Sequence, residues 1–284
     1  MNTLLKQMMA NADPSQVPGL ARFFKTGPGQ YGEGDKFLGI KVPVTREVVK
    51  GCWKEVSFAD LEECISSEYH EVRLAALLTL VEIFKHAKRP PIRSGATSCP
   101  APTGLEATSC PAPTGLEVTS YPAPTGHLLQ QQCVDFYLSH TAYINNWDLV
   151  DLSCYPLLGE WLLGASDRSL LYDLARNGKT LWEQRIGMVS TMTFIRHGQL
   201  ADTFAIADIL LHHSHDLIHK AVGWLLREAG KRDKPALEAF LKGPDPARHS
   251  RPDRESPRYR TMPRTMLRYA IEKFPEPERQ RFLA

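Results

Sequence analysis

The sequence predicts an all-α protein, and two observations point to this fold class. Apolar residues recur every three or four positions, as on amphipathic helices, and no segment shows the alternation that marks a half-buried strand. Short groups of Gly, Pro, Asp and Ser separate these segments. The expected helices span residues 45–56, 58–67, 70–87, 127–144, 147–163, 167–177, 180–198, 200–213, 215–230 and 234–243.

A low-complexity insertion interrupts the helical pattern at residues 93–126. The eleven residues ATSCPAPTGLE begin at Ala96 and again at Ala107, and a shortened copy, VTSYPAPTG, begins at Val118. Such Pro-, Thr- and Gly-rich copies bury too little apolar surface to fold alone. We therefore expect one domain over residues 1–284, interrupted by a disordered segment at 93–126.

A longer period appears once the insertion is left out. Arg73 and Arg185 are then separated by two steps of 39 residues, and Lys220 follows Arg185 by 35. Asn146 follows Arg73 by one step of 39. A period of 35 to 40 residues made of two helices is typical of HEAT-like repeats. The expected architecture is an α-α superhelix, or solenoid, whose concave face is the place to look for function.

Charge and cysteine usage limit the classes of protein. The 34 Lys and Arg residues nearly balance the 32 Asp and Glu residues, but residues 231–284 carry 14 basic and 8 acidic side chains. This basic end fits either a polyanion contact or an ordinary solvated surface. The six cysteines form no CxxC pair, which indicates reduced thiols in a cytoplasmic protein. Since no apolar run is long enough to span a bilayer, we expect no membrane contact.

The stretch NNWDLVD, residues 145–151, combines helix-start chemistry with a candidate site. Asn145, Asn146 and Asp148 suit the N-cap and first turn of a helix and need no further role. Trp147 and Asp151 are four residues apart and share one helix face. Asp151 stands between the apolar residues Val150 and Leu152, where a charged side chain is unfavourable unless it is paired or takes part in function.

Arg185 and Trp224 occupy comparable helices of later repeats, differ by 39 residues, and are expected to line the same groove. Taken singly, either tryptophan fits a core position, and Asp151 or Arg185 fits the surface. Only their joint spacing favours a site.

An aromatic groove with a carboxylate suits a flat cationic ligand, and an arginine suits a phosphate. An N7- or N3-alkylated purine in DNA combines both features. A carboxylate would stabilise the oxocarbenium-like transition state of its hydrolysis and orient water. Since the set contains no lysine, no Schiff-base lyase step is expected. His212, His213, His215 and His219 lack accompanying carboxylate or thiol ligands, so we expect neither a metal nor a cofactor.

At these residues the sequence resembles the AlkD-like family of DNA alkylation repair glycosylases, which are built from HEAT-like repeats. The resemblance covers nearly the whole chain apart from the first dozen residues and the insertion. It is carried by FLGIKVP at residues 37–43, NNWDLVD at 145–151, LWEQR at 181–185, KAVGWLLRE around Trp224 and MPRTMLRYAIEKF from Met262.

The resemblance implies a DNA-facing cleft formed by Trp147, Asp151, Arg185 and Trp224. It also implies excision of alkylated purines without the base-flipping pocket of most glycosylases. Tyr31 resembles the family's N-terminal aromatic residue, and Lys41 follows Gly39-Ile40 where some members carry glutamine. Members that bind DNA structures without excision also exist. The basic residues Arg258, Arg260, Arg264 and Arg268 suit phosphate contacts near one end of the solenoid.

We therefore predict a monofunctional DNA glycosylase that releases 3-methyladenine and 7-methylguanine from duplex DNA in base excision repair. Asp151, Trp147 and Trp224 are the expected catalytic residues. The expected DNA-binding residues are Arg185, which would hold the lesion-strand phosphate, together with Tyr31, Lys41 and Arg264. We expect a cytoplasmic, nucleoid-associated monomer. The alternatives are a non-catalytic protein that binds bent or branched DNA, and a protein-interaction scaffold.

Overall fold

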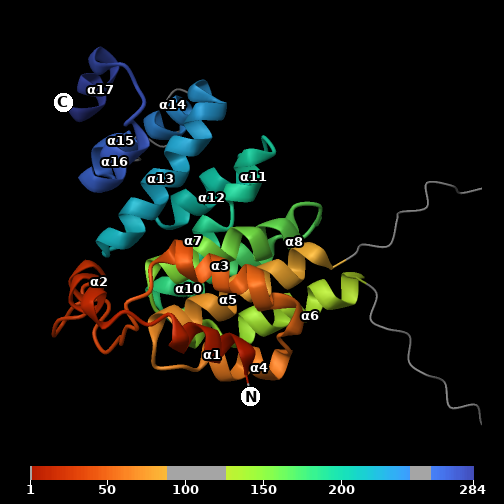
Figure 1. The fold of residues 1–284 in the computed structure, drawn as a ribbon. Coiled ribbons are helices and arrows are strands. Elements are labelled where there is room, and N and C mark those ends of the chain that lie inside the picture. Colours follow the sequence, from red (N-terminus) through yellow and green to blue (C-terminus); the bar gives the residue numbers. More distant parts are fainter. Residues whose placement is uncertain (1, 88–125, 244–256) are drawn as a thin grey trace, which may run out of the picture.

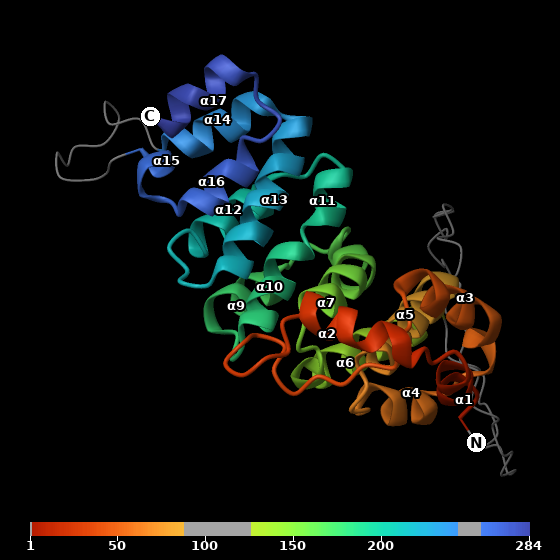
Figure 2. The same ribbon diagram turned by 60° about the vertical axis from the view of Figure 1, so that its left-hand side comes forward.

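The predicted all-α fold class is confirmed, and the helices are arranged as an α-α superhelix (Figure 1). This computed structural model describes residues 2–87, 126–243 and 257–284. Within these residues there is no β-strand, and an isolated bridge joins Lys36 to Tyr69. In Figure 2, α1, α3 and α4 lie at one end of the molecule and α14 to α17 at the other, whereas α2 lies in the middle beside α7. None of the described helices is both long and apolar enough to cross a lipid bilayer.

A row of helices runs through the molecule, and each member contacts the next in chain order. We call it the central row. It consists of α5 (His70–His86), α7 (Trp147–Cys154), α10 (Leu181–Val189), α13 (Asp216–Arg232) and α16 (Arg264–Ala270).

Further helices pack against the central row, so that each turn of the superhelix has two layers. Among these contacts, α4 and α6 pack on α5, α9 packs on α10, and α12 and α14 pack on α13. These outer helices are α4 (Phe58–Ile65), α6 (Gly126–Ser139), α9 (Ser169–Asn177), α12 (Ala201–Ile209) and α14 (Lys234–Lys242).

Elements at the two ends complete the molecule. The N-terminal elements are α1 (Thr3–Ala10), the 3-10 helix Pro14–Gln16, α2 (Val17–Phe23), α3 (Val42–Cys52) and the 3-10 helix Trp53–Glu55. The C-terminal elements besides α16 are α15 (Arg258–Thr261) and α17 (Glu276–Leu283).

The residues that marked the longer period do fall at equivalent places. Arg73, Arg185 and Lys220 each lie in the first two turns of a central-row helix, namely α5, α10 and α13. Asn146 is the N-cap of α7. The period therefore locates the beginnings of α5, α7, α10 and α13. These beginnings lie side by side, since Arg73 bonds Asn145 and Arg185 bonds both Asp151 and the carbonyl oxygen of Leu217.

Burial on one face explains why these segments are helical. In α13 the fully buried residues are Ile218, Ala221, Val222, Leu225, Leu226 and Ala229, which follow the three- and four-residue spacing of one helix face. The opposite face carries charged residues such as Lys220 and Arg227. This pattern places α13 with its apolar stripe in the core and leaves the start of its polar face open to a cavity.

Several expected helices are broken or end early, and at one of them a proline interrupts the backbone ladder. Pro156 has no N–H to donate, and the chain forms a π-helical turn there before helix resumes. The segment 127–144 ends as helix at Ser139, and 180–198 breaks at Ser190-Thr191. The added elements are the 3-10 helix Thr141–Tyr143, the π-helix Tyr155–Gly159, α8 (Glu160–Leu162) and α11 (Met192–Arg196).

The predicted insertion at 93–126 lies almost wholly outside the described residues. Gly126, placed at its end, already belongs to α6. Of the six cysteines, those in the described part of the chain are free and buried, as expected for reduced thiols: Cys52, Cys64, Cys133 and Cys154.

Candidate active site

One cavity gathers most of the residues that the sequence singled out. It has a volume of about 440 Å³ and lies where α2 meets the beginnings of α7, α10 and α13. Figure 2 shows α2 lying across α7. The lining residues are Phe23, Tyr31, Trp147, Arg185, Leu217, Lys220, Trp224 and Tyr269. We call this space the Trp147 cavity.

Asp151 adjoins the Trp147 cavity through Arg185. Arg185 Nε donates to Asp151 Oδ1 at 2.8 Å, and Nη2 donates to Oδ2 at 2.7 Å. A third donor, Nη1, bonds the carbonyl oxygen of Leu217 at the start of α13. The pairing is bidentate, a geometry that a planar guanidinium provides and an ammonium does not. It ties α7, α10 and α13 together at the cavity.

Both partners of this ion pair are largely withdrawn from water. The side chain of Asp151 is 14% exposed and that of Arg185 is 6% exposed. Burial raises the pKa of the Asp151 carboxyl, and the charge and hydrogen bonds of Arg185 offset this only in part. The acid that the sequence left without a partner among apolar neighbours therefore has one in Arg185.

Arg185 was expected to hold a phosphate, and the structure places it differently. Three of its five N–H donors are directed to Asp151 and Leu217. Its role toward DNA stays a prediction. Its observed contacts are those of a residue that orients the carboxylate.

Aromatic side chains form the walls of the Trp147 cavity. Phe24 lies roughly parallel to Trp147, with ring centroids 5.7 Å apart, and Phe23 meets Trp147 edge-on at 5.9 Å. Tyr31 lines the cavity beside Trp147. Phe23 is 59% exposed, which is unusual for so large an apolar residue. The walls therefore include an aromatic ring open to solvent beside the candidate catalytic tryptophan.

The opposite wall depends on a close helix contact. A Cβ atom on Gly223 of α13 would lie 2.5 Å from Tyr269 Cβ and 2.6 Å from Met266 O. Glycine at this position lets α16 approach α13 closely. Tyr269 and Trp224 line the same cavity as a result.

A buried charge network anchors the N-terminal segment beside Trp147. His70 Nε2 lies 2.9 Å from Asp148 Oδ2, and His70 Nδ1 lies 3.2 Å from Asp35 Oδ2. Arg73 Nη2 donates to Asp35 Oδ1 at 2.7 Å and to Asn145 Oδ1 at 3.1 Å. The network joins α5, the start of α7 and the loop that carries Tyr31.

This network gives two residues of NNWDLVD, Asn145 and Asp148, partners that the sequence did not predict. Asn146 is the N-cap, since its side chain accepts from the backbone N–H of Trp147. Asn145 instead bonds Arg73 and Asp35, and Asp148 is a buried partner of His70. Their partners lie far away in sequence, so the helix-start pattern could not reveal them.

The charges of the network stabilise one another. Burial lowers the pKa of His70, but the hydrogen bonds with Asp148 and Asp35 outweigh it and raise the pKa to about 9. Burial raises the pKa of Asp35, and the contacts with His70 and Arg73 outweigh it and lower the pKa to about 2. His70 is therefore a buried cation at neutral pH.

The structure corrects the expectation that no lysine belongs to the site. Lys220 lines the Trp147 cavity, four residues before Trp224 on the same face of α13. Its Nζ lies 2.7 Å from Asp216 Oδ2. The spacing from Trp224 was visible in the sequence and could have identified it.

Two predicted DNA contacts lie away from this cavity. Lys41 is exposed at the N-cap of α3, and Arg264 is exposed and donates to the carbonyl oxygen of Leu283. Neither lines the Trp147 cavity. A phosphate contact by either residue stays a prediction. Phe23 and Tyr269 also line the cavity and were missed, because no local pattern marks a residue that reaches a site from another repeat. Leu217 was missed as well, although it lies seven residues before Trp224 on the same helix.

No metal centre is found among the residues that the structure describes. His213 Nε2 pairs with Gln184 Oε1 at 2.9 Å, and His219 Nε2 bonds the backbone oxygen of His213. His213 and His219, two of the four histidines considered above as metal ligands, thus already have hydrogen-bond partners within the protein.

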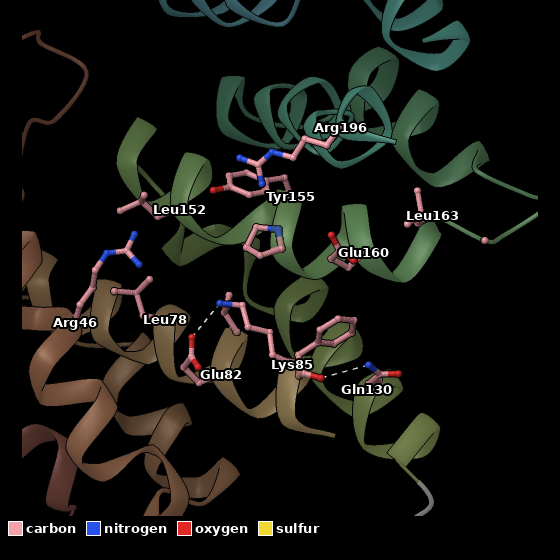
Figure 3. A pocket seen from close by; sticks show the side chains of 14 residues that line it. Arg46, Leu78, Glu82, Lys85, Gln130, Leu152, Tyr155, Glu160, Leu163 and Arg196 are labelled. Carbon is pink, nitrogen blue, oxygen red and sulfur yellow. Dashed lines mark hydrogen bonds and ion pairs between the residues drawn. The ribbon is translucent and has the colours of Figure 1, made fainter. Parts of the chain in front are cut away.

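Two further cavities lie near the Trp147 cavity and are linked to it by shared lining residues. Trp224 also lines a second cavity of about 540 Å³, with Arg196, Lys231 and Arg232. Arg196 in turn lines a third cavity of about 580 Å³ that includes Arg46 (Figure 3). In Figure 3 the guanidinium of Arg196 lies over the ring of Tyr155, at 4.6 Å from its centroid. Neighbouring cavities thus share one lining residue, and we call the three together the path; its basic side chains are accompanied by Glu82, Glu160 and Glu228.

Comparisons with known proteins bear on the family and the fold of the chain. The sequence matches the family described as DNA alkylation repair enzyme over residues 4–94 and 119–274. A solved structure, described as a predicted DNA alkylation repair enzyme from Enterococcus faecalis, has a TM-score of 0.57 at 13% identity. The match covers 93% of this chain and 97% of that chain. At this identity it establishes a shared fold. No curated protein sequence matches the chain.

Proposed function

Since the chain belongs to the DNA alkylation repair enzyme family, we propose that it is a monofunctional glycosylase for cationic alkylated purines in duplex DNA. The observation that carries the proposal is the carboxylate of Asp151, held by two bonds from Arg185 next to the aromatic Trp147 cavity. The predicted substrates are 3-methyladenine and 7-methylguanine.

The chemistry follows from the charges of such a lesion. The positive charge of an alkylated purine weakens its glycosidic bond, and positive charge develops on the sugar as that bond breaks. A fixed carboxylate in a poorly hydrated site stabilises the developing charge more than water does. Asp151 is the group proposed for this role. The faces of Trp147 and Trp224 suit contact with the cationic nucleotide.

Arg185 contributes by fixing the carboxylate. Each oxygen of Asp151 accepts one N–H from Arg185 and keeps a further lone pair. Those lone pairs remain for water or for the sugar. We propose that this preorganisation, rather than a change in net charge, is the main effect of Arg185 on the reaction.

DNA would lie along the path formed by the three cavities. Arg196 and Arg46 belong to the part of the path beyond Trp224. Their spacing along the superhelix suits a phosphate backbone that crosses several repeats. The central row supplies residues to all three cavities.

A monofunctional reaction is proposed even though a lysine lines the site. A Schiff base requires a neutral amine, whereas the hydrogen bond with Asp216 raises the pKa of Lys220. Lys220 is therefore an ammonium at neutral pH. The product would be an intact strand with an abasic site.

The test is release of 7-methylguanine and 3-methyladenine from methylated duplex DNA. Wild-type protein should release the bases, and Asp151→Asn should lose at least about 100-fold in single-turnover rate. Asp173→Asn, an exposed acid of α9, is the matched control and should keep wild-type activity.

Absence of release by the wild type would overturn the proposal, and equal rates for wild type and Asp151→Asn would remove the role of Asp151. If the wild type binds DNA without release, the non-catalytic DNA-binding alternative is favoured. Absence of both binding and release favours the scaffold alternative.

A further inference from the structure

The two cationic side chains of the Trp147 cavity are Arg185 and Lys220, and they differ in what they can still bind. Arg185 is 6% exposed and already forms a bidentate pair with Asp151. Its positive charge is matched by that carboxylate. A phosphate arriving from solvent would compete with Asp151 for the same guanidinium.

Lys220 is placed to meet an anion from solvent. Its side chain is 41% exposed, and its ion pair with Asp216 lies at a surface where Asp216 is 54% exposed. An ammonium has three N–H donors, so Lys220 can keep the contact with Asp216 and donate to a second oxygen. The pair with Asp216 also holds the side chain beside the cavity.

Tyr31 and Tyr269 line the cavity together with Lys220. A phosphate bound to Lys220 would therefore be flanked by polar aromatic side chains, and Trp224 lies one helical turn further along α13. This arrangement places a phosphate and a nucleoside on neighbouring parts of one helix face.

We propose that Lys220, rather than Arg185, binds a backbone phosphate of the DNA at the Trp147 cavity. This assignment rests on the proposed function in that it takes DNA as the ligand. It divides the two cations by role: Arg185 positions the Asp151 carboxylate, and Lys220 holds the strand.

The experiment measures affinity for undamaged duplex DNA at several salt concentrations, using Lys220→Gln, Lys220→Arg and Lys242→Gln. Lys242 is the matched control, because it also pairs with an acid four residues earlier, Glu238, but on the outer helix α14. The logarithm of the binding constant falls linearly with the logarithm of the salt concentration. Loss of one phosphate contact makes this negative slope shallower by about 0.9. Lys220→Gln should show this loss, and Lys220→Arg and Lys242→Gln should keep the wild-type slope.

A wild-type slope for Lys220→Gln, or an equal loss for Lys242→Gln, would overturn the inference, as would absence of DNA binding by the wild type. The readout uses undamaged DNA and is independent of excision. If the wild type releases no alkylated base while Lys220→Gln still loses one unit of slope, the glycosylase proposal fails and the phosphate assignment stands.

Discussion

The guanidinium of Arg185 holds the carboxylate of Asp151 by two parallel hydrogen bonds across two neighbouring helices of the central row. The residues are 34 positions apart in sequence, and both are largely buried. The contact links the stability of the superhelix to the proposed chemistry.

Arg185→Gln should therefore lower both stability and activity. Removing one partner of a buried pair leaves an uncompensated charge, which costs about 3 kcal/mol in the free energy of unfolding. Denaturant unfolding measures this loss. The double variant Asp151→Asn/Arg185→Gln should regain part of it, because no buried charge remains. Simple addition of the two single effects in the double variant would mean that the residues are not coupled.

The rate of excision should depend on the ionisation of Asp151. Burial raises the pKa of this carboxyl above its usual 3.8, so kcat should begin to fall at a higher pH than for an exposed aspartate. Arg185 offsets part of that rise, so in Arg185→Gln the acidic limb should move to still higher pH. Single-turnover rates between pH 4 and 8, corrected for uncatalysed release, test this. An acidic limb at the same pH in both proteins would contradict it.

The His70 network should make stability fall at alkaline pH. The pKa of His70 is raised from 6.5 to about 9 in the folded protein, so its contribution is complete below about pH 6.5 and is lost as the pH rises to about 9. The shift corresponds to roughly 3 kcal/mol.

In the same network, the pKa of Asp35 is lowered to about 2, and its contribution to stability is lost as the pH falls from 3.8 toward that value.

The alkaline loss from His70 is tested by melting temperatures. Those of wild type and His70→Gln should converge between pH 7 and 9. A constant difference over that range would show that His70 does not titrate there.

We expect Phe23 to contribute to the activity on alkylated DNA and to contribute little to the stability of the fold. Its ring is 59% exposed, lines the Trp147 cavity and meets Trp147 edge-on. Phe23→Ala should leave the melting temperature nearly unchanged and lower kcat/KM for methylated DNA by about tenfold, equivalent to about 1.4 kcal/mol. Leu128→Ala removes another exposed apolar residue, 53% exposed on α6, and should change neither. Equal effects of the two substitutions would remove the special role of Phe23.

The sequence alone determined the class of fold and the places where α5, α7, α10 and α13 begin. Amphipathic spacing and helix caps are local properties, so Asn146 could be recognised as a helix start and Trp147 and Asp151 as neighbours on one face. The longer period placed Arg185 and Trp224 on comparable helices, and both line one cavity with Trp147.

The tertiary structure decided which side chains pair with one another. Asp148 and Asn145 looked like helix-start residues until the fold brought His70 and Arg73 against them from α5. Arg185 looked like a free cation until the stacking of α10 on α7 paired it with Asp151. The physical reason is that helix periodicity repeats within a few residues. Contacts between repeats depend on how closely successive helices pack, and this is set by the whole stack of side chains.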